Sequence, residues 1–232
     1  MDMPEVTLEK KKLSDKVLDQ VMDWIMDGKI QMGERLNTDE LAKKLHVSRM
    51  PVRDAIKEVE KKGLVESIAY KGARLVNLSE DDVRQLYLMR SLLEPTLGYY
   101  ACRNATEADI DYCTQVITKF EEDVATGTCS AKGLYLNNRS FHFSIYDASH
   151  LTMLIDVVNN IWDKLAFYKL IYGQNYIQDA QMMQQQVNDH RLYYTLFQGR
   201  KADELKERLY ANLLHFEDVM PKLAEEISVH EK

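Results

Sequence analysis

Two arginines four residues apart are the side chains in this sequence whose types and spacing most clearly suggest chemistry. Arg49 and Arg53 lie in a stretch whose apolar residues recur at helical spacing, and Lys57 follows one turn later. A guanidinium group can donate two parallel hydrogen bonds to the edge of a guanine, or it can hold phosphate oxygens. We therefore interpret this side of the helix as a nucleic-acid contact. The alternative is a solvated basic face on an ordinary surface helix.

Two short helices joined by a tight turn must position these cations. The first helix is predicted over residues 39–45, and the turn is His46-Val47-Ser48. Ser48 suits the N-cap of the second helix, and Pro51 is harmless there because first-turn N–H groups have no helical partner. The second helix ends at Gly63. Its apolar stripe consists of Val52, Ala55, Ile56 and Val59. This arrangement predicts a helix-turn-helix.

The flanking segments complete a small domain around the two helices. A helix over residues 11–28 has an apolar face that can pack on them. Two alternating runs, residues 64–67 and 73–76, predict a β-hairpin. The turn between the runs holds Lys71 and Gly72, which could approach a phosphate or the minor groove. A plain hairpin edge is the alternative for this turn.

Charge is distributed unevenly along the chain. Its 232 residues carry 30 Lys and Arg against 37 Asp and Glu, which gives a formal net charge of −7. Residues 1–78 hold 15 of the cations and 14 of the acids, whereas residues 79–232 hold 15 and 23. The acidity therefore belongs to the second part. It does not argue against nucleic-acid binding by the first, because exposed charges are screened beyond about 8–10 Å.

Five short segments of the first part match a known pattern in order and spacing. They are Gly33-Glu34-Arg35-Leu36, Leu41-Ala42, Val47-Ser48-Arg49, Pro51-Val52-Arg53 and Gly63-Leu64-Val65. The stretch resembles the winged helix-turn-helix of the GntR family of bacterial transcription regulators. The residues that this resemblance implies in DNA binding are Arg35, Thr38, Ser48, Arg49, Met50, Arg53, Lys71 and Gly72. Many family members have a DNA-contacting arginine where this chain has Asp39, so that contact is not carried over.

The second part, residues 79–232, is predicted to be all-helical. Ser79 and the three acidic residues after it form a strong helix start, because serine caps and carboxylates favour the positive end of a helix. The predicted helices cover residues 80–103, 107–126, 131–148, 151–172, 178–198 and 201–228, with Gly173 and Gly199 at breaks. The predicted fold class is mostly α. It combines a winged helix-turn-helix over residues 1–78 with an all-α helical bundle over residues 79–232.

Three segments of the predicted bundle also match a known domain. They are Met89-Arg90-Ser91-Leu92-Leu93-Glu94-Pro95, Arg139-Ser140-Phe141-His142 and the segment around His190. These segments resemble the FCD ligand-sensing domain of the FadR branch of GntR regulators. The resemblance implies a divalent metal held by one aspartate and three histidines, with an effector carboxylate beside it. The corresponding residues here are Asn138, His142, His190 and Asn212, and His215 is reached only by a register shift in the last helix.

The two asparagines change the chemistry of that site. Asparagine offers neither the anion of aspartate nor the imidazole nitrogen that zinc and nickel favour. We therefore expect weak or absent metal binding by His142 and His190, with His215 as the candidate third ligand. The amides and imidazoles could instead hydrogen-bond a polar effector, and Arg90 could bind its carboxylate. The alternatives are satisfied core histidines and an Arg90–Glu94 pair at i,i+4 spacing.

The rest of the sequence limits the class of protein. Three cysteines without CxxC spacing favour a reducing cytoplasm, no apolar run approaches the ~20 residues of a membrane span, and no signal peptide is recognisable. We predict a cytoplasmic, homodimeric transcription regulator that binds a palindromic double-stranded DNA operator and a small organic acid as effector. Alternatives are a metal-dependent enzyme with His142 and His190 as ligands, or a helical protein-interaction module. The absence of a nucleophile–base constellation, a phosphate loop and HExxH disfavours an enzyme.

Overall fold

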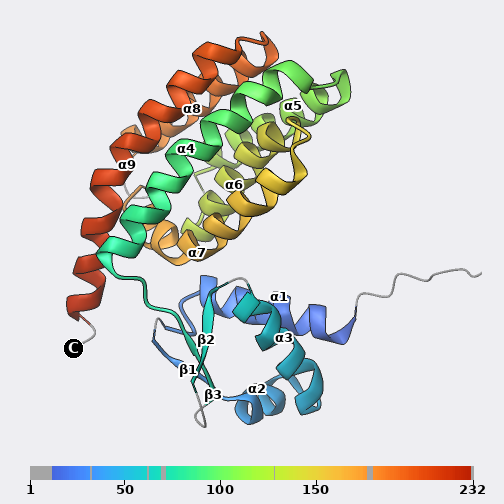
Figure 1. The fold of residues 1–232 in the computed structure, drawn as a ribbon, viewed down its shortest axis with the longest axis vertical. Helices are drawn as coiled ribbons and strands as arrows, with labels where there is room; N and C mark the ends of the chain where they lie inside the picture. The colour runs from blue at the N-terminus through green and yellow to red at the C-terminus, as the bar shows by residue number, and fades with distance from the viewer. Residues whose placement is uncertain are drawn as a thin grey trace, which may run out of the picture. The chain divides into compact units, whose positions relative to one another are not determined.

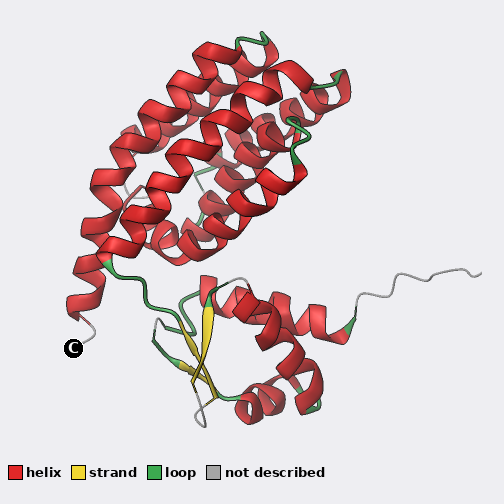
Figure 2. Cartoon of the chain, in the orientation of Figure 1, coloured by secondary structure: helices red, strands yellow, loops and turns green. Residues whose placement is uncertain are grey.

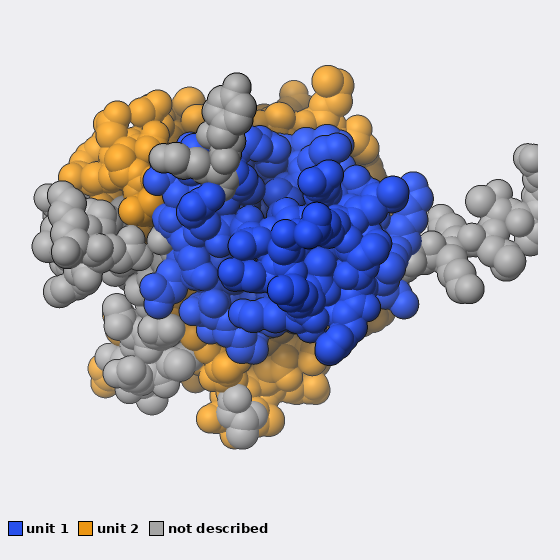
Figure 3. Space-filling view, turned by 90° about the horizontal axis from the view of Figure 1, so that it is seen from below, with its two compact units in different colours: residues 1–76 blue, residues 77–232 orange. Residues whose placement is uncertain are grey.

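The computed structural model describes residues 12–31, 33–61, 63–68, 72–127, 129–176 and 180–230. The chain forms two compact units, residues 1–76 and residues 77–232, which are coloured separately in Figure 3. The first unit combines helices with a small sheet, and the described part of the second is a helical bundle (Figures 1 and 2). None of the helices in the described ranges is long and apolar enough to cross a membrane.

Three helices and three short strands make up the described part of the first unit. The helices are α1 (Leu13–Met26), α2 (Thr38–Leu45) and α3 (Arg49–Lys61), and the strands are β1 (Arg35–Leu36), β2 (Val65–Ile68) and β3 (Gly72–Leu75). The buried face of α1 consists of Val17, Val21 and Ile25. It packs against α3, whose buried residues are the apolar stripe expected from the sequence. This core fixes which side of α3 faces outward.

The sheet has three antiparallel strands rather than the two of the predicted hairpin. Its order is β1-β3-β2, with Arg35 opposite Arg74 and Val65 opposite Leu75. A strand of two residues is too short to show alternation, so β1 gave no sequence signal. The two expected strands lie one residue from their predicted positions. Gly72, expected in the turn, instead begins β3 with φ +88°, a conformation that favours glycine.

Six long helices form the described part of the second unit. They are α4 (Glu80–Asn104), α5 (Glu107–Ala125), α6 (Ala131–Asp147), α7 (Thr152–Tyr176), α8 (Ala180–Gln198) and α9 (Ala202–His230). Each predicted helix is confirmed, with ends within four residues of the observed ones. The predicted break at Gly173 is wrong, because this glycine lies inside α7. A single glycine lowers helix stability by only about 1 kcal/mol, which packing overcomes.

Side-chain caps explain why the helix starts were predictable. The hydroxyl oxygens of Ser79, Thr106 and Ser130 accept the N–H groups of residues 82, 109 and 133 at 3.1, 3.2 and 3.0 Å. At the first two starts an aspartate returns the interaction by accepting the backbone N–H of the cap residue, which makes a capping box. These bonds satisfy amide groups that the helix itself leaves unpaired.

The first helix of the bundle, α4, is its central element. It packs against α6, α7, α8 and, most extensively, the antiparallel α9 (Figure 1). Gly98 sits at the close approach of α4 to α9, where a Cβ atom would lie 2.5 Å from Cδ1 of Leu209. The absence of a side chain at this position therefore lets the two helices approach. Eleven residues of α4 are buried, among them Arg90 and Glu94.

The first residues of the second unit are attached to α7 by one hydroxyl group. Tyr168, which is completely buried, accepts the N–H of Leu78 at 2.9 Å. The same oxygen lies 3.0 Å from the carbonyl oxygen of Leu78 and 3.1 Å from Oδ1 of Asn77. A tyrosine has one proton to donate, so these two oxygens share it. The segment that enters the bundle is thereby held against the middle of α7.

Candidate functional site

Backbone geometry shapes the helix-turn-helix. Oδ1 of Asn37 caps α2 by accepting the N–H of Asp39 at 2.9 Å. His46 then takes the left-handed conformation, φ +54°, and ends this helix. After Ser48, α3 begins at Arg49. The expected end at Gly63 is confirmed, because its φ is +70° and its N–H donates to the carbonyl of Glu60 at 2.8 Å.

The outward side of α3 carries most of the predicted DNA-contacting residues. Val52, Ala55 and Val59 are completely buried, so the opposite side of the helix must be in solvent. The predicted or basic residues exposed on or beside it are Ser48, Arg49, Met50, Arg53 and Lys57, and the acids Asp54 and Glu58 are exposed as well. Arg35 and Gly72 are exposed on the sheet, and Thr38 is half-buried at the start of α2. Lys71 lies outside the described residues.

One of the two arginines is held by an acid from α2. Asp39 accepts from Nε of Arg49 at 2.6 Å and from Nη2 at 2.9 Å, and both side chains are at least half exposed. Such an exposed pair contributes only about 0–1 kcal/mol, so a phosphate or a guanine can replace the carboxylate. Arg53 makes no ion pair in the described part of the chain. The sequence showed only that Asp39 removes a family contact; the structure adds that it engages Arg49.

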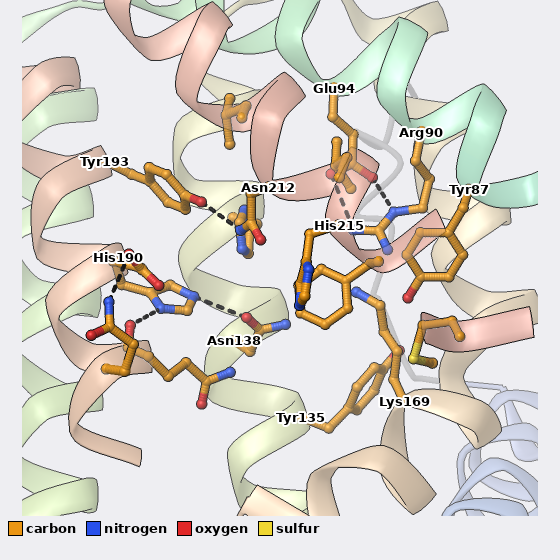
Figure 4. Close-up of a pocket in the computed structure, with 18 of the residues that line it drawn as sticks. Tyr87, Arg90, Glu94, Tyr135, Asn138, Lys169, His190, Tyr193, Asn212 and His215 are labelled. Atoms are coloured by element: carbon orange, nitrogen blue, oxygen red, sulfur yellow. Dashed lines mark hydrogen bonds and ion pairs between the residues drawn. The ribbon is translucent and has the colours of Figure 1, made fainter. Parts of the chain in front are cut away.

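A cavity of about 310 Å³ lies inside the helical bundle. Five helices, α4 and α6 to α9, contribute to its wall, and Figure 4 shows the side chains that point into it. The predicted residues Arg90, Asn138, His142, His190, Asn212 and His215 all line it. The sequence-based grouping of these residues, which lie on four different helices, is therefore correct in space. Their individual roles remain predictions.

Glu94 is the most heavily hydrogen-bonded group of the cavity wall. Its Oε1 accepts from Nε of Arg90 at 2.5 Å and from Nε1 of Trp162 at 2.8 Å. Its Oε2 accepts from Nη2 of Arg90 at 3.2 Å and from the hydroxyl of Tyr146 at 2.7 Å. Burial favours the neutral acid, but the Arg90 charge outweighs it and holds the pKa of Glu94 below its usual range. The i,i+4 pair considered from the sequence is present, and it is buried.

His142 joins this network through one ring nitrogen. Nδ1 of His142 lies 3.2 Å from the hydroxyl oxygen of Tyr146, whose proton is already donated to Glu94. The ring must therefore donate from Nδ1, which leaves the lone pair on Nε2. Burial, together with electrostatic repulsion from His190 and Lys169, holds the pKa of His142 well below its usual range. His142 is thus a neutral imidazole at neutral pH.

His190 and Asn138 form a second polar contact across the cavity wall. Nδ1 of His190 lies 2.6 Å from the carbonyl oxygen of Gln186, which can only accept, so this nitrogen carries the proton. Burial lowers the pKa of His190 to about 4, so Nε2 has a lone pair. Its neighbour is the Asn138 amide, placed with Oδ1 at 2.9 Å. A lone pair needs a donor, so we assign the amide the flipped orientation, with its NH₂ toward the ring.

Asn212, the last of the predicted polar positions, also forms a hydrogen bond within the cavity wall. The amide nitrogen of Asn212 donates to the hydroxyl of Tyr193 at 2.5 Å, and burial raises the pKa of that hydroxyl to about 12. His215, one turn further along α9, is exposed and packs its ring beside Phe216. Figure 4 shows His190, Asn138 and Tyr193 on one side of the cavity and the Arg90–Glu94 pair on the other.

The donor groups at these positions do not suit a divalent transition metal. Among the described residues no three His, Cys, Asp or Glu side chains come together as a metal-binding group. The Asn138 amide occupies the lone pair of His190, and Asn212 donates to Tyr193. Neither asparagine supplies charge to replace the water lost by the ion. Weak or absent binding of zinc or nickel stays our prediction, and His215 does not complete the set.

Comparison with protein families assigns both units. The FCD domain model matches residues 85–215, which is more than half of the chain, and the model of the bacterial regulatory proteins of the gntR family matches residues 13–75. The chain belongs to the GntR family and carries an FCD domain. It is therefore a GntR-family transcription regulator, and such regulators are not enzymes, which excludes the metal-dependent enzyme considered above.

Relatives of this GntR-family chain resemble it along most of their length. The Nta operon transcriptional regulator of Aminobacter aminovorans is 28% identical over 189 residues, which cover 81% of this chain and 85% of the relative. An uncharacterized HTH-type transcriptional regulator of Bacillus subtilis, YdhC, is 26% identical over 196 residues, with 84% and 85% covered. The solved structure of E. coli McbR/YncC has a TM-score of 0.77 at 17% identity, covering 92% and 99%, which supports the fold.

Lys169, a charged residue of this FCD domain's cavity, was not among the residues predicted from the sequence. Lys169 of α7 lines the cavity and places its ammonium group 3.2 Å from the centre of the Trp162 ring. A single lysine in an apolar helix gives no signal, because lysine usually reaches solvent from such positions.

Proposed function

We propose that this chain binds a palindromic operator as a homodimer, and that a small organic acid in the cavity of the helical unit alters that binding. The observation that supports DNA recognition best is the division of α3 into two sides. One side is completely buried, and the other presents Arg49 and Arg53 in solvent from the first turns of the helix. This is the geometry with which a recognition helix enters the major groove.

An exposed apolar strip on the bundle supports a dimer. On α4, Leu88 and Leu92 are 47% and 61% exposed and lie one turn apart. On the neighbouring α9, Tyr210 and Leu214 are 44% and 41% exposed with the same spacing. Large apolar side chains aligned on two adjacent helices usually mark a protein–protein contact. A two-fold dimer would match the symmetry of a palindromic site.

The cavity supports the effector part of the proposal. Its volume of about 310 Å³ lies near the lower end of small-molecule sites, which span roughly 300–1,000 Å³. Its wall combines apolar residues with a few fixed polar groups, as ligand sites do. The volume of the cavity therefore suits a small metabolite.

Selection of DNA from a random-sequence pool by the purified chain tests the operator proposal. We expect enrichment of an inverted repeat, and we expect Arg53→Ala to weaken binding to it by about 1–3 kcal/mol and to relax the preference at one base position. Arg103→Ala, a change at an exposed arginine of α4, is the matched control and should bind like the wild type. If no sequence is enriched, or if Arg53→Ala binds selected and random DNA as the wild type does, the proposed interface is wrong.

Sedimentation of the free protein tests the dimer. The wild type should sediment as a dimer of the 27.0 kDa chain at micromolar concentration. Leu92→Asp places a charge in the exposed strip and should shift the protein toward monomer. Met153→Asp, at an 85% exposed position of α7 outside the strip, should leave the dimer intact. A monomeric wild type, both free and on DNA, would refute the homodimer.

A further inference from the structure

Lys169 is a partly buried cation that has no ion-pair partner among the described residues. Lys169 is half-buried on α7 and extends into the cavity (Figure 4). Its ammonium group lies over the face of the Trp162 ring. No carboxylate forms an ion pair with it in the ranges that the structure describes. An aromatic face stabilises a cation by about 0.5–2 kcal/mol, which is less than the cost of removing an ammonium group from water. The position is therefore favourable only when another group supplies negative charge.

The acids of the cavity wall are already neutralised. Both oxygens of Glu94 are saturated by Arg90, Tyr146 and Trp162. Asp189, the other acid of the wall, pairs with Arg208 at 3.0 Å. The remaining polar groups of the wall around Asn138 are neutral amides, hydroxyls and the imidazoles of His142 and His190. The cavity therefore carries one positive charge more than it balances whenever Lys169 is protonated.

A second polar atom of the same cavity also lacks a partner. The side-chain oxygen of Gln186 is buried, and it is the one atom of this kind in the described chain that no hydrogen-bond partner reaches. Gln186 lines the cavity from α8. Leaving such an acceptor unsatisfied costs about 1–3 kcal/mol, so a ligand with a hydrogen-bond donor is favoured there. Hydroxyl and amino groups are donors of this kind.

We propose that Lys169 anchors the carboxylate of the effector, and that the effector is a small carboxylic acid with hydroxyl or amino groups that reach Gln186. This inference rests on the proposed function, because it takes the cavity to be the effector site. In this proposal the positive charge that binds the effector carboxylate comes from Lys169 and not from a metal ion. The asparagines that weaken the metal site are then compatible with recognition of an anion, because the cation comes from α7.

The protonation of Lys169 makes this anchor sensitive to pH. Burial and the nearby Arg90 charge hold the pKa of Lys169 well below its usual range. A bound carboxylate stabilises the ammonium form, so binding takes up a proton and affinity falls as pH rises. The ionisable groups that share the cavity wall with Lys169 are Tyr87, Arg90 and Glu94 of α4, Tyr135 and His142 of α6, Asp189, His190 and Tyr193 of α8, and His215 of α9. The charge of Arg139 on α6 also acts on Lys169. His142 and His190 stay neutral above pH 7 and so do not produce this change.

Trp162 offers a direct readout of binding in the free protein. The chain has two tryptophans, so a Trp24→Phe background leaves Trp162 as the only indole fluorophore. The probes are glycerate and gluconate, with glycerol and sorbitol as their uncharged counterparts and acetate as a carboxylate without hydroxyls. We expect the two hydroxy acids to bind most tightly. Lys169→Met should weaken them about 10- to 100-fold, the loss expected for a hydrogen bond to a charged group.

Two further variants separate charge from packing. Lys164→Met removes a lysine of the same helix that does not line the cavity, and it should bind every probe like the wild type. Lys169→Arg keeps the charge and should retain part of the affinity. In the absence of ligand, Lys169→Met should melt at the same temperature or higher, because it removes an unpaired buried charge.

Three results would overturn the proposal. One is equal affinity of wild type and Lys169→Met for the hydroxy acids, which would leave Lys169 as a packing residue on Trp162. Another is the absence of binding by either hydroxy acid at about 10 mM, the concentration that even a weak site would fill. The third needs no variant: an affinity of the wild type that does not change from pH 7 to about pH 9. Because DNA is absent from these measurements, a failure of the operator experiment leaves their outcome unaffected.

Discussion

At the scale of single residues, the helical unit contains several buried polar side chains whose hydrogen-bond partners are identified. Arg90, Glu94, His142 and His190 are all at most 8% exposed. Arg90 satisfies Glu94 from the same helix, so the pair is complete without a ligand. Such a pair does little for net stability but costs about 3–5 kcal/mol to break. Arg90 therefore already has a partner on its own helix, whereas Lys169 has no ion pair in the described part of the chain.

Acid should destabilise the helical unit through its buried imidazoles. An unfolded histidine has a pKa near 6.5, whereas burial lowers the pKa of His190 to about 4. The unfolded chain therefore binds more protons below pH 6.5, and the free energy of unfolding falls as pH falls toward 4. At pH 5 the contribution of His190 is about 2 kcal/mol. Urea unfolding followed by Trp162 fluorescence at pH 7.5 and pH 5 measures the difference.

Two variants test the assignment of this pH dependence. His190→Phe should reduce the difference in unfolding free energy between the two pH values by about 2 kcal/mol, because phenylalanine does not titrate. The rings of Phe120 and Phe141, at 5.0 and 4.7 Å between centroids, provide aromatic surroundings for the new ring. His46→Asn changes an exposed histidine that has no ion pair in the described part of the chain, and it should leave the difference as it is. If the difference in unfolding free energy between the two pH values is unchanged in His190→Phe, the assignment of His190 as a buried neutral imidazole is contradicted.

Restoring the charge and the nitrogen at the two asparagines should create a metal site. Asn138→Asp together with Asn212→His supplies one anion and one more imidazole beside His142 and His190, and should raise zinc affinity by orders of magnitude. Each single change should give less. Thermal shifts with and without zinc measure this, because binding to the native state alone raises the melting temperature. Stoichiometric zinc or nickel that stays with the wild type through dialysis would contradict the expectation of a weak or absent site.

At the scale of elements, Gly98 determines how closely α4 and α9 approach. A Cβ at this position would meet Leu209 at 2.5 Å, so Gly98→Ala should force the helices apart and destabilise the bundle by about 1–3 kcal/mol. Gly133→Ala in α6 is the matched control, because its Cβ would meet no atom closer than 3.4 Å. There alanine should stabilise by about 0.5–1 kcal/mol. Chemical denaturation of both variants measures the sign of each change in unfolding free energy. Equal changes in the two variants would contradict the close approach of α4 and α9 at Gly98.

The sequence predicted elements well where a local signal exists. Ser79 and Thr106 mark helix starts because their hydroxyls cap the chain within three residues. The pairing of Arg90 with Glu94 followed from i,i+4 spacing. The strand β1 was missed because its two residues are defined by pairing with distant β3. Lys169 was missed for a related reason, since its burial depends on helices far away in the sequence.

At the scale of the whole molecule, the middle of α7 connects the cavity with the start of the second unit. Tyr168 binds the backbone of Leu78, and the next residue is Lys169 in the cavity wall. Residues 77 and 78 follow directly after the first unit, residues 1–76. If ligand binding displaces this turn of α7, the displacement acts on residues 77 and 78, which the Tyr168 hydroxyl contacts.

Tyr168→Phe should separate ligand binding from its effect on DNA. The change removes the hydroxyl that holds Leu78 and Asn77 but leaves the ring in place. We expect glycerate or gluconate affinity to change less than about threefold, while the ratio of operator affinities with and without ligand falls toward one. Fluorescence anisotropy of labelled operator measures that ratio. A ratio equal to that of the wild type would show that the hydroxyl does not transmit the signal.

The adjacency of Tyr168 and Lys169 has a thermodynamic consequence for how the regulator senses its metabolite. If ligand changes operator affinity by some factor, the operator must change ligand affinity by the same factor. A molecule bound to its operator and a molecule free in the cell then respond at different metabolite concentrations. In the proposed dimeric regulator, the metabolite threshold is therefore a property of the protein–DNA complex, and it depends on how many operator copies the cell offers to each dimer.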